Sequence, residues 1–155
     1  MAPDGSGNIR LEVITPERIV LGEDTESIIV PGARGYIGVL PGHAPMVVSL
    51  KIGLVKYRQG GAYRRLAVSG GFFEIAGDKA VVLAETAERG EEIDVTRARA
   101  ALERARRRLA ARRDTTIDMA RAEAALQRAL TRLRAAGVSP EKVIGQADRD
   151  RPDSE

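Results

Sequence analysis

The first half of the chain alternates short apolar segments with turns. Eight segments rich in β-branched residues read RLEVI, SIIV, YIGVL, MVVS, GLVKYR, YRRLAV, FFEI and KAVVLAE. Turn signals such as Pro31-Gly32 and Pro41-Gly42 separate them, and Gly60-Gly61 predicts a hairpin because both glycines accept a positive φ. Short strands at this spacing are typical of an all-β sandwich or barrel. Some segments carry apolar residues on both faces, which favours two packed sheets.

The pattern changes after Gly90. Gly and Pro are absent from residues 91–136, where Ala and Arg dominate. Apolar residues recur there at spacings of three and four, the period of an amphipathic helix. Two such seams are Ala98, Leu102, Ala105, Leu109 and then Met119, Ala122, Leu126, Ala129, Leu133. We therefore expect two helices that pack as an antiparallel hairpin over residues 91–137, with Asp94 as the first N-cap.

The predicted hairpin has a turn that its sequence does not fix, and apolar seams that contain many small residues. The helices break near residues 112–116, where no Gly or Pro fixes the turn and where Thr115 with Asp118 resembles a capping box. Because the seams are rich in Ala, closing the hairpin buries little apolar area, and we expect it to open readily. The remaining domain boundaries that we predict are a β-sandwich domain over residues 9–90 and flexible tails at 1–8 and 138–155.

Charge is distributed unevenly along the chain, although the formal net charge is only +3. Residues 1–90 contain ten Lys or Arg and ten Asp or Glu, whereas residues 97–134 contain twelve Arg and four acids, which leaves +8. A partner that binds through charge is therefore expected at the helical region. There is no Cys, which excludes disulfides and thiolate metal sites, and no apolar run reaches the roughly 20 residues that span a bilayer.

Recognisable catalytic machinery is missing from the sequence. His43 is the single histidine, and it lies in a Pro-Gly turn, where a structural role is the commoner one. The stretch GARGYIGVLPG lacks the GxxxxGK[ST] pattern of a P-loop and precedes no predicted helix, so it is not a dinucleotide fingerprint. Metal-ligand spacings are also missing. We therefore predict a protein that is not an enzyme.

Four stretches of the chain carry a family resemblance. They read VITPERIV, GVLPGHAPMV, LAVSGGFFEI and AERGEEIDVTRARAALERARRRL. In their order and spacing they resemble the epsilon subunit of the F-type ATP synthase, over about residues 13–133. The resemblance implies a non-catalytic subunit of the central stalk. It also implies an N-terminal antiparallel β-sandwich of about ten strands followed by a C-terminal two-helix antiparallel hairpin.

The same resemblance implies partners and a place in the cell. The sandwich is expected to dock on the gamma subunit and the membrane c-ring. The hairpin is expected either to fold against the sandwich or to extend along gamma toward the alpha and beta subunits, where it blocks ATP hydrolysis. The protein would associate with the membrane only through the complex, on the cytoplasmic side of a bacterial membrane.

Some bacterial members of that family bind ATP at a motif of the form I/L-D-x-x-R-A. Here the motif is complete as Ile93-Asp94-Val95-Thr96-Arg97-Ala98, and the family's supporting positions fall on Glu88, Arg104, Arg128 and Arg132. Arginine suits phosphate by charge and by bidentate geometry. The resemblance thus implies ATP as a regulatory ligand, with no cofactor required. The alternative is that Asp94 only caps the helix and the arginines are only solvated.

Further residues resemble partner contacts of the family. One group would meet an acidic segment of the beta subunit when the helices extend, or else stay solvated: Arg106, Arg107, Arg108, Arg112 and Arg113. His43, in LPGHAP, corresponds to a segment near the gamma contact, or to a turn fixed by its prolines. Tyr36 stands where many relatives carry an acid, which puts ring contacts through that position in doubt.

Two other classes of protein compete with this interpretation. The basic helices suit a nucleic-acid-binding module, but residues 91–155 contain no aromatic side chain for base stacking and the β half shows no basic stripe. A scaffold protein with a coiled-coil arm is the other class, which a failure to co-purify with a gamma subunit would favour. We expect no nucleic-acid partner.

Overall fold

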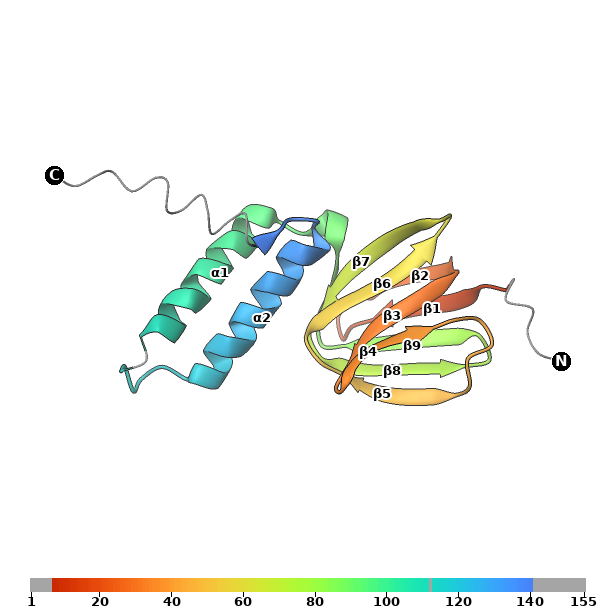
Figure 1. The fold of residues 1–155 in the computed structure, drawn as a ribbon, viewed down its shortest axis with the longest axis horizontal. Coiled ribbons are helices and arrows are strands. Elements are labelled where there is room, and N and C mark those ends of the chain that lie inside the picture. The colour runs from red at the N-terminus through yellow and green to blue at the C-terminus, as the bar shows by residue number, and fades with distance from the viewer. Residues whose placement is uncertain (1–6, 112, 141–155) are drawn as a thin grey trace.

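The computed structural model describes residues 7–111 and 113–140, as a β domain followed by a helical hairpin (Figure 1). The strands are β1 (Ile9–Ile14), β2 (Ile19–Thr25), β3 (Ser27–Gly32), β4 (Gly35–Val39), β5 (Met46–Leu50), β6 (Gly53–Gln59), β7 (Ala62–Val68), β8 (Gly71–Ala76), β9 (Lys79–Ala84) and β10 (Ala87–Arg89). A 3-10 helix at Gly90–Glu92 leads into α1 (Val95–Ala110), and α2 follows at Met119–Ala135. The predicted class, a sandwich of about ten strands followed by two helices, is confirmed.

The strands form one hydrogen-bonded path that folds over on itself. Its order is β10-β7-β6-β3-β5-β8-β9-β1-β2, with β4 paired to β3. Among the described strands, β1 and β9 run parallel, with Val13 opposite Val82, and the other pairs are antiparallel. The prediction of a wholly antiparallel sandwich therefore needs one correction. It arises because the first strand of the chain lies between β9 and β2, where it runs in the same direction as β9.

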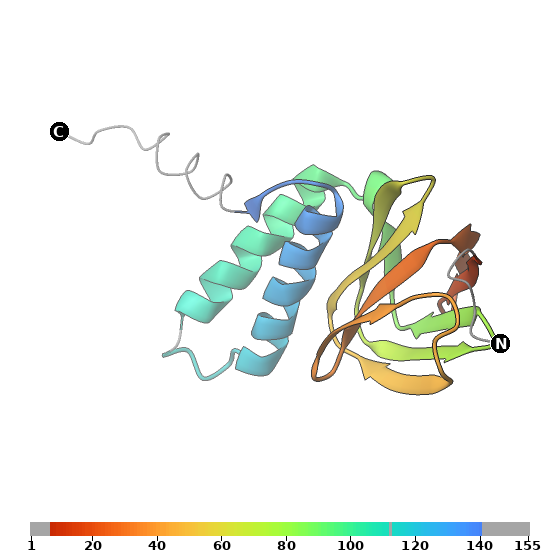
Figure 2. The ribbon, with the colours of Figure 1, turned by 45° about the vertical axis from the view of Figure 1, so that its right-hand side comes forward.

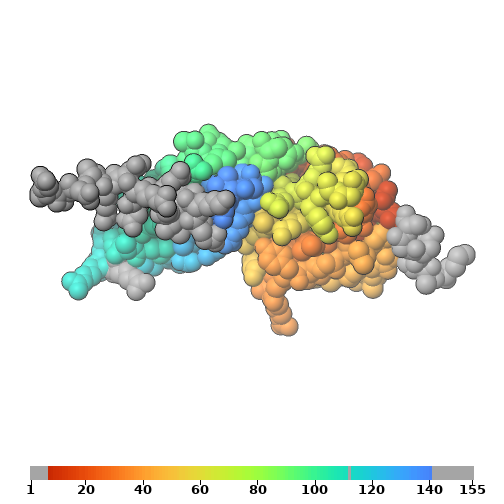
Figure 3. Space-filling view, turned by 45° about the horizontal axis from the view of Figure 1, so that its top comes forward, coloured from red at the N-terminus to blue at the C-terminus, as the bar shows by residue number. Residues whose placement is uncertain are grey.

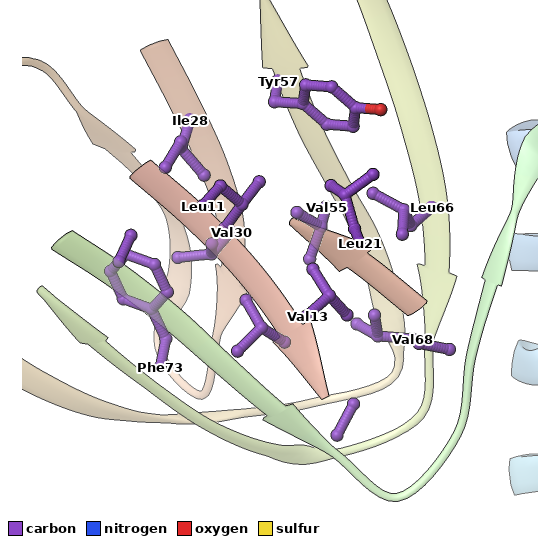
Figure 4. Packing of buried hydrophobic residues seen from close by; sticks show 14 of the residues in the cluster. Leu11, Val13, Leu21, Ile28, Val30, Val55, Tyr57, Leu66, Val68 and Phe73 are labelled. Atoms are coloured by element: carbon purple, nitrogen blue, oxygen red, sulfur yellow. The ribbon is translucent and has the colours of Figure 1, made fainter. Parts of the chain in front are cut away.

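Alternate side chains of the strands fill the core of the sandwich. In β1, Ile9, Leu11 and Val13 are fully buried while their neighbours are not, as the two-residue period of a strand requires. Figure 4 shows Leu11, Val13 and other aliphatic side chains from several strands pointing toward one another, with Tyr57 and Phe73 among them. The core is therefore built mainly from Val, Ile and Leu.

The two end strands of the path, β10 and β2, are joined by a side chain. Arg89, the last residue of β10, donates from Nε and Nη2 to the Val20 carbonyl oxygen of β2, at 3.1 and 2.7 Å. Edge strands expose unpaired backbone groups, and this guanidinium satisfies one of them. The contact therefore fixes the residue that immediately precedes the helical domain.

The first helix begins as its sequence predicts, and the two helices pack through the predicted seams. Asp94 caps α1 by accepting from the Arg97 amide at 3.0 Å, and Asp118 caps α2 by accepting from the Arg121 amide at 3.1 Å. The predicted seams supply the buried residues Ala98, Leu102, Ala105, Ala122, Ala129 and Leu133. Met119 is 37% exposed, so the first position of the second seam lies outside the contact.

The turn between the helices is organised differently from the prediction. Thr115 and Asp118 do not form a capping box, since Asp118 is itself the N-cap of α2. Instead, the Asp114 carboxylate accepts from the Thr116 amide at 2.9 Å and from the Thr116 hydroxyl at 2.6 Å. Asp is short enough to bond a backbone group two residues ahead, which is the geometry of an Asx turn. Arg112 lies outside the described residues.

The α2 helix lies between α1 and the sandwich (Figures 1 and 2). A second apolar cluster joins the two domains, in which Leu54 of β6 and Ala67 of β7 pack with residues of the hairpin such as Leu133 and Ala135. In the space-filling view, the green segment that enters α1 and the blue end of α2 rest against the yellow strands (Figure 3). The interdomain contact is therefore built partly from alanine.

Gly90 lies at the closest approach between the domains. A Cβ placed on Gly90 would lie 2.1 Å from the Ala135 carbonyl oxygen of α2, much closer than any real contact. The obstacle is a backbone carbonyl group, which cannot move aside as the end of a flexible side chain could. Only glycine at position 90 lets the end of α2 dock against the sandwich in this way.

The α2 helix ends at a glycine. Gly137, at φ +78°, donates to the Arg134 carbonyl, and Val138 donates to the Leu133 carbonyl at 2.9 Å, a Schellman motif. Val138 also packs against the interdomain cluster. Most of the two predicted flexible tails, residues 1–6 and 141–155, lies outside the described residues.

We predict that Gly90→Ala weakens the docking of the hairpin by about 1–3 kcal/mol, since an added methyl group in a filled space costs that much. Amide hydrogen exchange near the end of α2 should become roughly tenfold faster or more, while the strands of the sandwich keep their protection. Gly38→Ala is the control, because no atom lies within 4 Å of a Cβ at that position. Unchanged exchange in α2 would contradict the steric argument.

We also predict a pH dependence of the interhelical turn. Hydrogen bonds from the Thr116 hydroxyl and then the Thr116 amide hold the pKa of Asp114 below its usual value. The turn is therefore stabilised above the usual carboxyl pKa, and this contribution is lost as the pH falls through the lowered pKa. In a carboxyl NMR titration, Thr116→Val should raise the pKa of Asp114 and Thr115→Val should not. Equal pKa values in the two variants would be inconsistent with this assignment.

Candidate functional site

A cleft of about 520 Å³ opens between the sandwich and the hairpin. This volume lies in the range of small-molecule sites, which is roughly 300–1,000 Å³. Its lining comes from β7, β10, α1, α2 and the loops beside them: Ala67, Val68, Ser69, Thr86, Glu88, Arg97, Ala101, Ala125, Arg128, Ala129, Thr131 and Arg132. Both domains and both helices therefore contribute to one concave site.

Small side chains create the space in this cleft. Ala101 of α1 faces it together with Ala125 and Ala129, which are one turn apart on α2, and Ala67 lies on the sandwich side. Larger apolar residues at these four positions would fill the gap between the domains. The same alanines that make the hairpin seams poor in buried area thus leave room for a ligand.

Three arginines and one glutamate give the cleft its charge. The Arg132 guanidinium pairs with both oxygens of Glu88, with Nε 2.9 Å from Oε1 and Nη2 3.1 Å from Oε2. Arg97 and Arg128 form no ion pair within residues 7–111 and 113–140. The cleft is therefore net positive, and two of its guanidinium groups are available to an anion.

Most residues of the I-D-x-x-R-A motif support the cleft from outside its lining. Ile93 is buried in the interdomain cluster, and Ala98 is fully buried in the seam of α1. Asp94 is exposed, and its carboxylate caps the helix through the Arg97 amide. Of the six motif residues only Arg97 is in the lining, so the motif fixes the position of that arginine.

The structure brings together four of the eight predicted ATP-binding residues in the lining, namely Glu88, Arg97, Arg128 and Arg132. Ile93, Asp94 and Ala98 support the start of α1 beside it. Arg104 is exposed on α1 and is absent from the described lining.

Hydroxyl groups in the cleft were not predicted from the sequence. Ser69 and Thr86 hydrogen-bond to each other through their side chains at the sandwich side, and the hydroxyl-bearing residue Thr131 is buried on α2. Ser69 precedes the turn between β7 and β8, where Gly70 has a positive φ. The spacing of Thr86 and Glu88 could have indicated that Thr86 belongs to the site, because residues two apart on an extended chain face the same side.

Two family models match consecutive parts of the chain. The model for the ATP synthase, Delta/Epsilon chain, beta-sandwich domain, matches residues 8–90. The model for the ATP synthase, Delta/Epsilon chain, long alpha-helix domain, matches residues 91–137. The chain belongs to the ATP synthase delta/epsilon family.

Curated relatives and a solved structure agree with this membership. The ATP synthase epsilon chain of Carboxydothermus hydrogenoformans is 57% identical over 104 residues, which cover 67% of this chain and 78% of that one. The epsilon chain of Moorella thermoacetica is 55% identical over 106 residues, 68% and 79% of the two chains. A chain in the cryo-EM structure of the Euglena gracilis mitochondrial ATP synthase, OSCP/F1/c-ring in rotational state 1, has a TM-score of 0.71 and 27% identity, over 88% of each chain.

No described helix combines the length and the apolar character needed to cross a membrane. Across the described ranges, 7–111 and 113–140, His and acidic side chains nowhere gather in a group of three that would hold a metal ion. The described lining of the cleft carries guanidinium groups, hydroxyl groups and the Glu88 carboxylate.

Two of the predicted partner-contact residues lie on the sandwich and are engaged within the chain. The Tyr36 hydroxyl accepts from the Leu54 amide at 3.4 Å, although the ring is 56% exposed. The His43 ring nitrogen Nδ1 lies 2.6 Å from the Ala44 carbonyl oxygen. The neighbouring Gly42 amide donates to the Asp78 carboxylate at 2.7 Å, so this turn is fixed by local contacts. These contacts support the structural interpretation of the loop, and the contact with gamma stays a prediction.

The predicted arginine run lies on the hairpin, far along the chain from Tyr36 and His43. Arg106 pairs with Glu103 at 3.1 Å, and Arg107 donates to the Glu103 carbonyl at 3.4 Å. Arg108 and Arg113 are exposed. The arginines therefore point in several directions, as consecutive positions on a helix must.

We predict that the Glu88–Arg132 pair contributes about 0.5–1 kcal/mol to the docking of the hairpin, as half-buried ion pairs do. A double-mutant cycle with Glu88→Gln and Arg132→Gln, followed by urea unfolding, measures this coupling. The more exposed Arg18–Glu92 pair serves as the control and should give a smaller value. The coupling should fall as salt is added. A coupling of zero at low salt would mean that the pair only fills space.

Proposed function

We propose that this chain is the epsilon subunit of an F-type ATP synthase and works in its central stalk without catalysing a reaction. The two family matches together span residues 8–137, and the relatives named above are ATP synthase epsilon chains. In this proposal the sandwich contacts the gamma subunit and the c-ring, and the hairpin reaches the alpha and beta subunits. The protein is held at the cytoplasmic side of a bacterial membrane only through that complex.

We propose further that the interdomain cleft binds ATP. The observation that carries this proposal is the convergence of Arg97, Arg128 and Arg132 on one cleft large enough for a nucleotide. Arg97 and Arg128 have no ion pair within the described chain and suit phosphate oxygens. The hydroxyls of Ser69 and Thr86 supply polar groups for a sugar or a base.

ATP would act here as a regulatory ligand. Glu88 is the one acidic residue in the described lining, and Arg132 already occupies it, so the cleft favours binding over hydrolysis. Because the lining comes from both domains and both helices, the cleft exists only when the hairpin is closed and docked. A ligand that binds only the docked state stabilises that state by mass action.

The opposite state of the hairpin would inhibit ATP hydrolysis. When the hairpin leaves the sandwich, the predicted arginine run becomes available to an acidic segment of the beta subunit. The arginines of that run that the structure describes are Arg106, Arg107, Arg108 and Arg113. The Arg106 guanidinium pairs with the Glu103 carboxylate, and the Arg107 guanidinium donates to the Glu103 carbonyl. A carboxylate of the beta subunit would replace these two contacts within the helix. Salt should weaken this contact, since exposed charges are screened. In this proposal, ATP holds the protein in the form that does not inhibit.

We expect isothermal titration calorimetry to show saturable binding of ATP to the full chain. Arg97→Gln and Arg128→Gln should each weaken that binding by about tenfold or more, because each removes a charge-assisted hydrogen bond. Arg99→Gln is the matched control, an exposed arginine of α1 outside the described lining. An equal loss in all three variants would indicate unspecific attraction. No binding at millimolar ATP would refute nucleotide sensing and leave the membership of the family intact.

A further inference from the structure

A groove of about 360 Å³ lies where the end of α2 meets the sandwich strands β6 and β7. Its charged residues are Lys56 of β6, Arg65 of β7 and Arg134 of α2, and its described lining contains no acid. The groove shares no lining residue with the interdomain cleft. It is therefore a separate basic surface, and the proposed nucleotide site does not account for it.

Two of these positive charges stand directly opposite each other in the sheet. Lys56 and Arg65 are partners in the antiparallel register of β6 and β7. The strand neighbours of Lys56, Val55 and Tyr57, are buried in the core, so the Lys56 side chain lies on the outer face of the sandwich. Like charges at directly opposite positions destabilise a strand pair. A negative charge placed on the groove would offset that cost.

The described chain does not supply this negative charge. Within residues 7–111 and 113–140, Lys56, Arg65 and Arg134 form no ion pair. Arg65 Nη1 donates to the Arg134 carbonyl oxygen at 3.5 Å, which keeps the Arg65 guanidinium beside the end of α2 but leaves its charge unpaired. The groove is therefore suited to an acidic segment of chain.

The segment that follows the groove in the sequence carries the complementary charge. Pro140, the last residue that the structure describes, is itself in the lining. Residues 141–155 read EKVIGQADRDRPDSE and contain five acids against three Lys or Arg, a net charge of −2. Four of the acids lie in residues 148–155. The eight residues that separate Pro140 from Asp148 reach roughly 26 Å when extended, which is enough to return to the groove.

We propose that residues 141–155 dock on this groove, with the acids of residues 148–155 against Lys56, Arg65 and Arg134. Because the lining comes from the sandwich and from the end of α2, the docked segment contacts both domains. The segment is released when the hairpin leaves the sandwich, since the groove no longer exists in that state. Salt weakens the docking by screening the charges. The proposal does not rest on the ATP site.

The test is paramagnetic relaxation enhancement, measured by NMR on the full chain. The chain has no Cys, so Ser154→Cys provides a single attachment point for a nitroxide label. An undirected segment of the length from Pro140 to Ser154 spans roughly 20 Å and affects all surrounding surfaces alike. A docked segment instead acts on the groove. At low salt we expect the amide signals of Lys56 and Arg65 to lose more than half of their intensity, and to recover it as salt is added.

Charge variants make the test specific to the groove. Lys56→Gln in the labelled chain should restore much of the Arg65 signal, because it removes one of the attracting charges. Lys51→Gln is the matched control, an exposed lysine of the same domain outside the described lining of the groove. Within the segment, Asp150→Asn should also restore the signal, whereas Arg151→Gln should deepen the loss. These two variants change the charge of the segment in opposite directions.

Three results would overturn the proposal. The first is an Arg65 signal that keeps its full intensity in the labelled parent chain. The second is an equal loss of that signal in Lys56→Gln and Lys51→Gln, because the charge of the groove would then be irrelevant. The third comes from mixing nitroxide-labelled chain with isotope-labelled chain that carries no nitroxide. Loss of the Arg65 signal in that mixture would assign the groove to the segment of a second copy, and not to the chain's own.

Discussion

The approach of α2 to Gly90 controls how the two domains meet. The backbone at Gly90 lies so close to the Ala135 carbonyl that no side chain fits between them. One residue earlier, Arg89 joins β10 to β2 through the Val20 carbonyl. Arg89 is thus held by the closure of the sandwich, and Gly90 lies against the backbone of α2. The hairpin docks in one place because these two contacts fix the residues that lead into it.

The docking at that point has a fixed geometry, but many of the side chains that it buries are small. The interdomain cluster contains Leu54, Leu102 and Leu133, with alanines at most of its other positions. Replacing several leucines by alanines in a seam removes several kcal/mol of apolar burial, at about 25 cal/mol per Å². A contact this modest is easily shifted by a ligand, because the free energy available from binding is of similar size. The alanines therefore leave space for the cleft and also keep the docking of the hairpin weak enough to be reversed.

The pattern of the sequence was sufficient for the layout of the chain. Strand periodicity, the loss of Gly and Pro after Gly90, and the alanine seams predicted the two domains. The arginines came from the family resemblance, which grouped Arg97, Arg104, Arg128 and Arg132; Arg104 is not among the residues that line the cleft. Sequence reasoning missed Ser69 and Thr86, because their contact depends on how the strands and the loops beside them pair. It also misjudged the interhelical turn, where Asp114 rather than Thr115 provides the hydrogen bonds. These features depend on which backbone groups are already satisfied, and spacing along the chain does not reveal that.

The positive charge of the interdomain cleft is not shared evenly among its arginines. Arg132 is paired with Glu88, so that pair contributes no net charge, whereas Arg97 and Arg128 have no ion pair within the described chain. The net positive charge of the described lining therefore comes from one guanidinium group of α1 and one of α2. Because like charges repel, an anion that contacts both groups would favour the closed hairpin, and in its absence the repulsion favours opening.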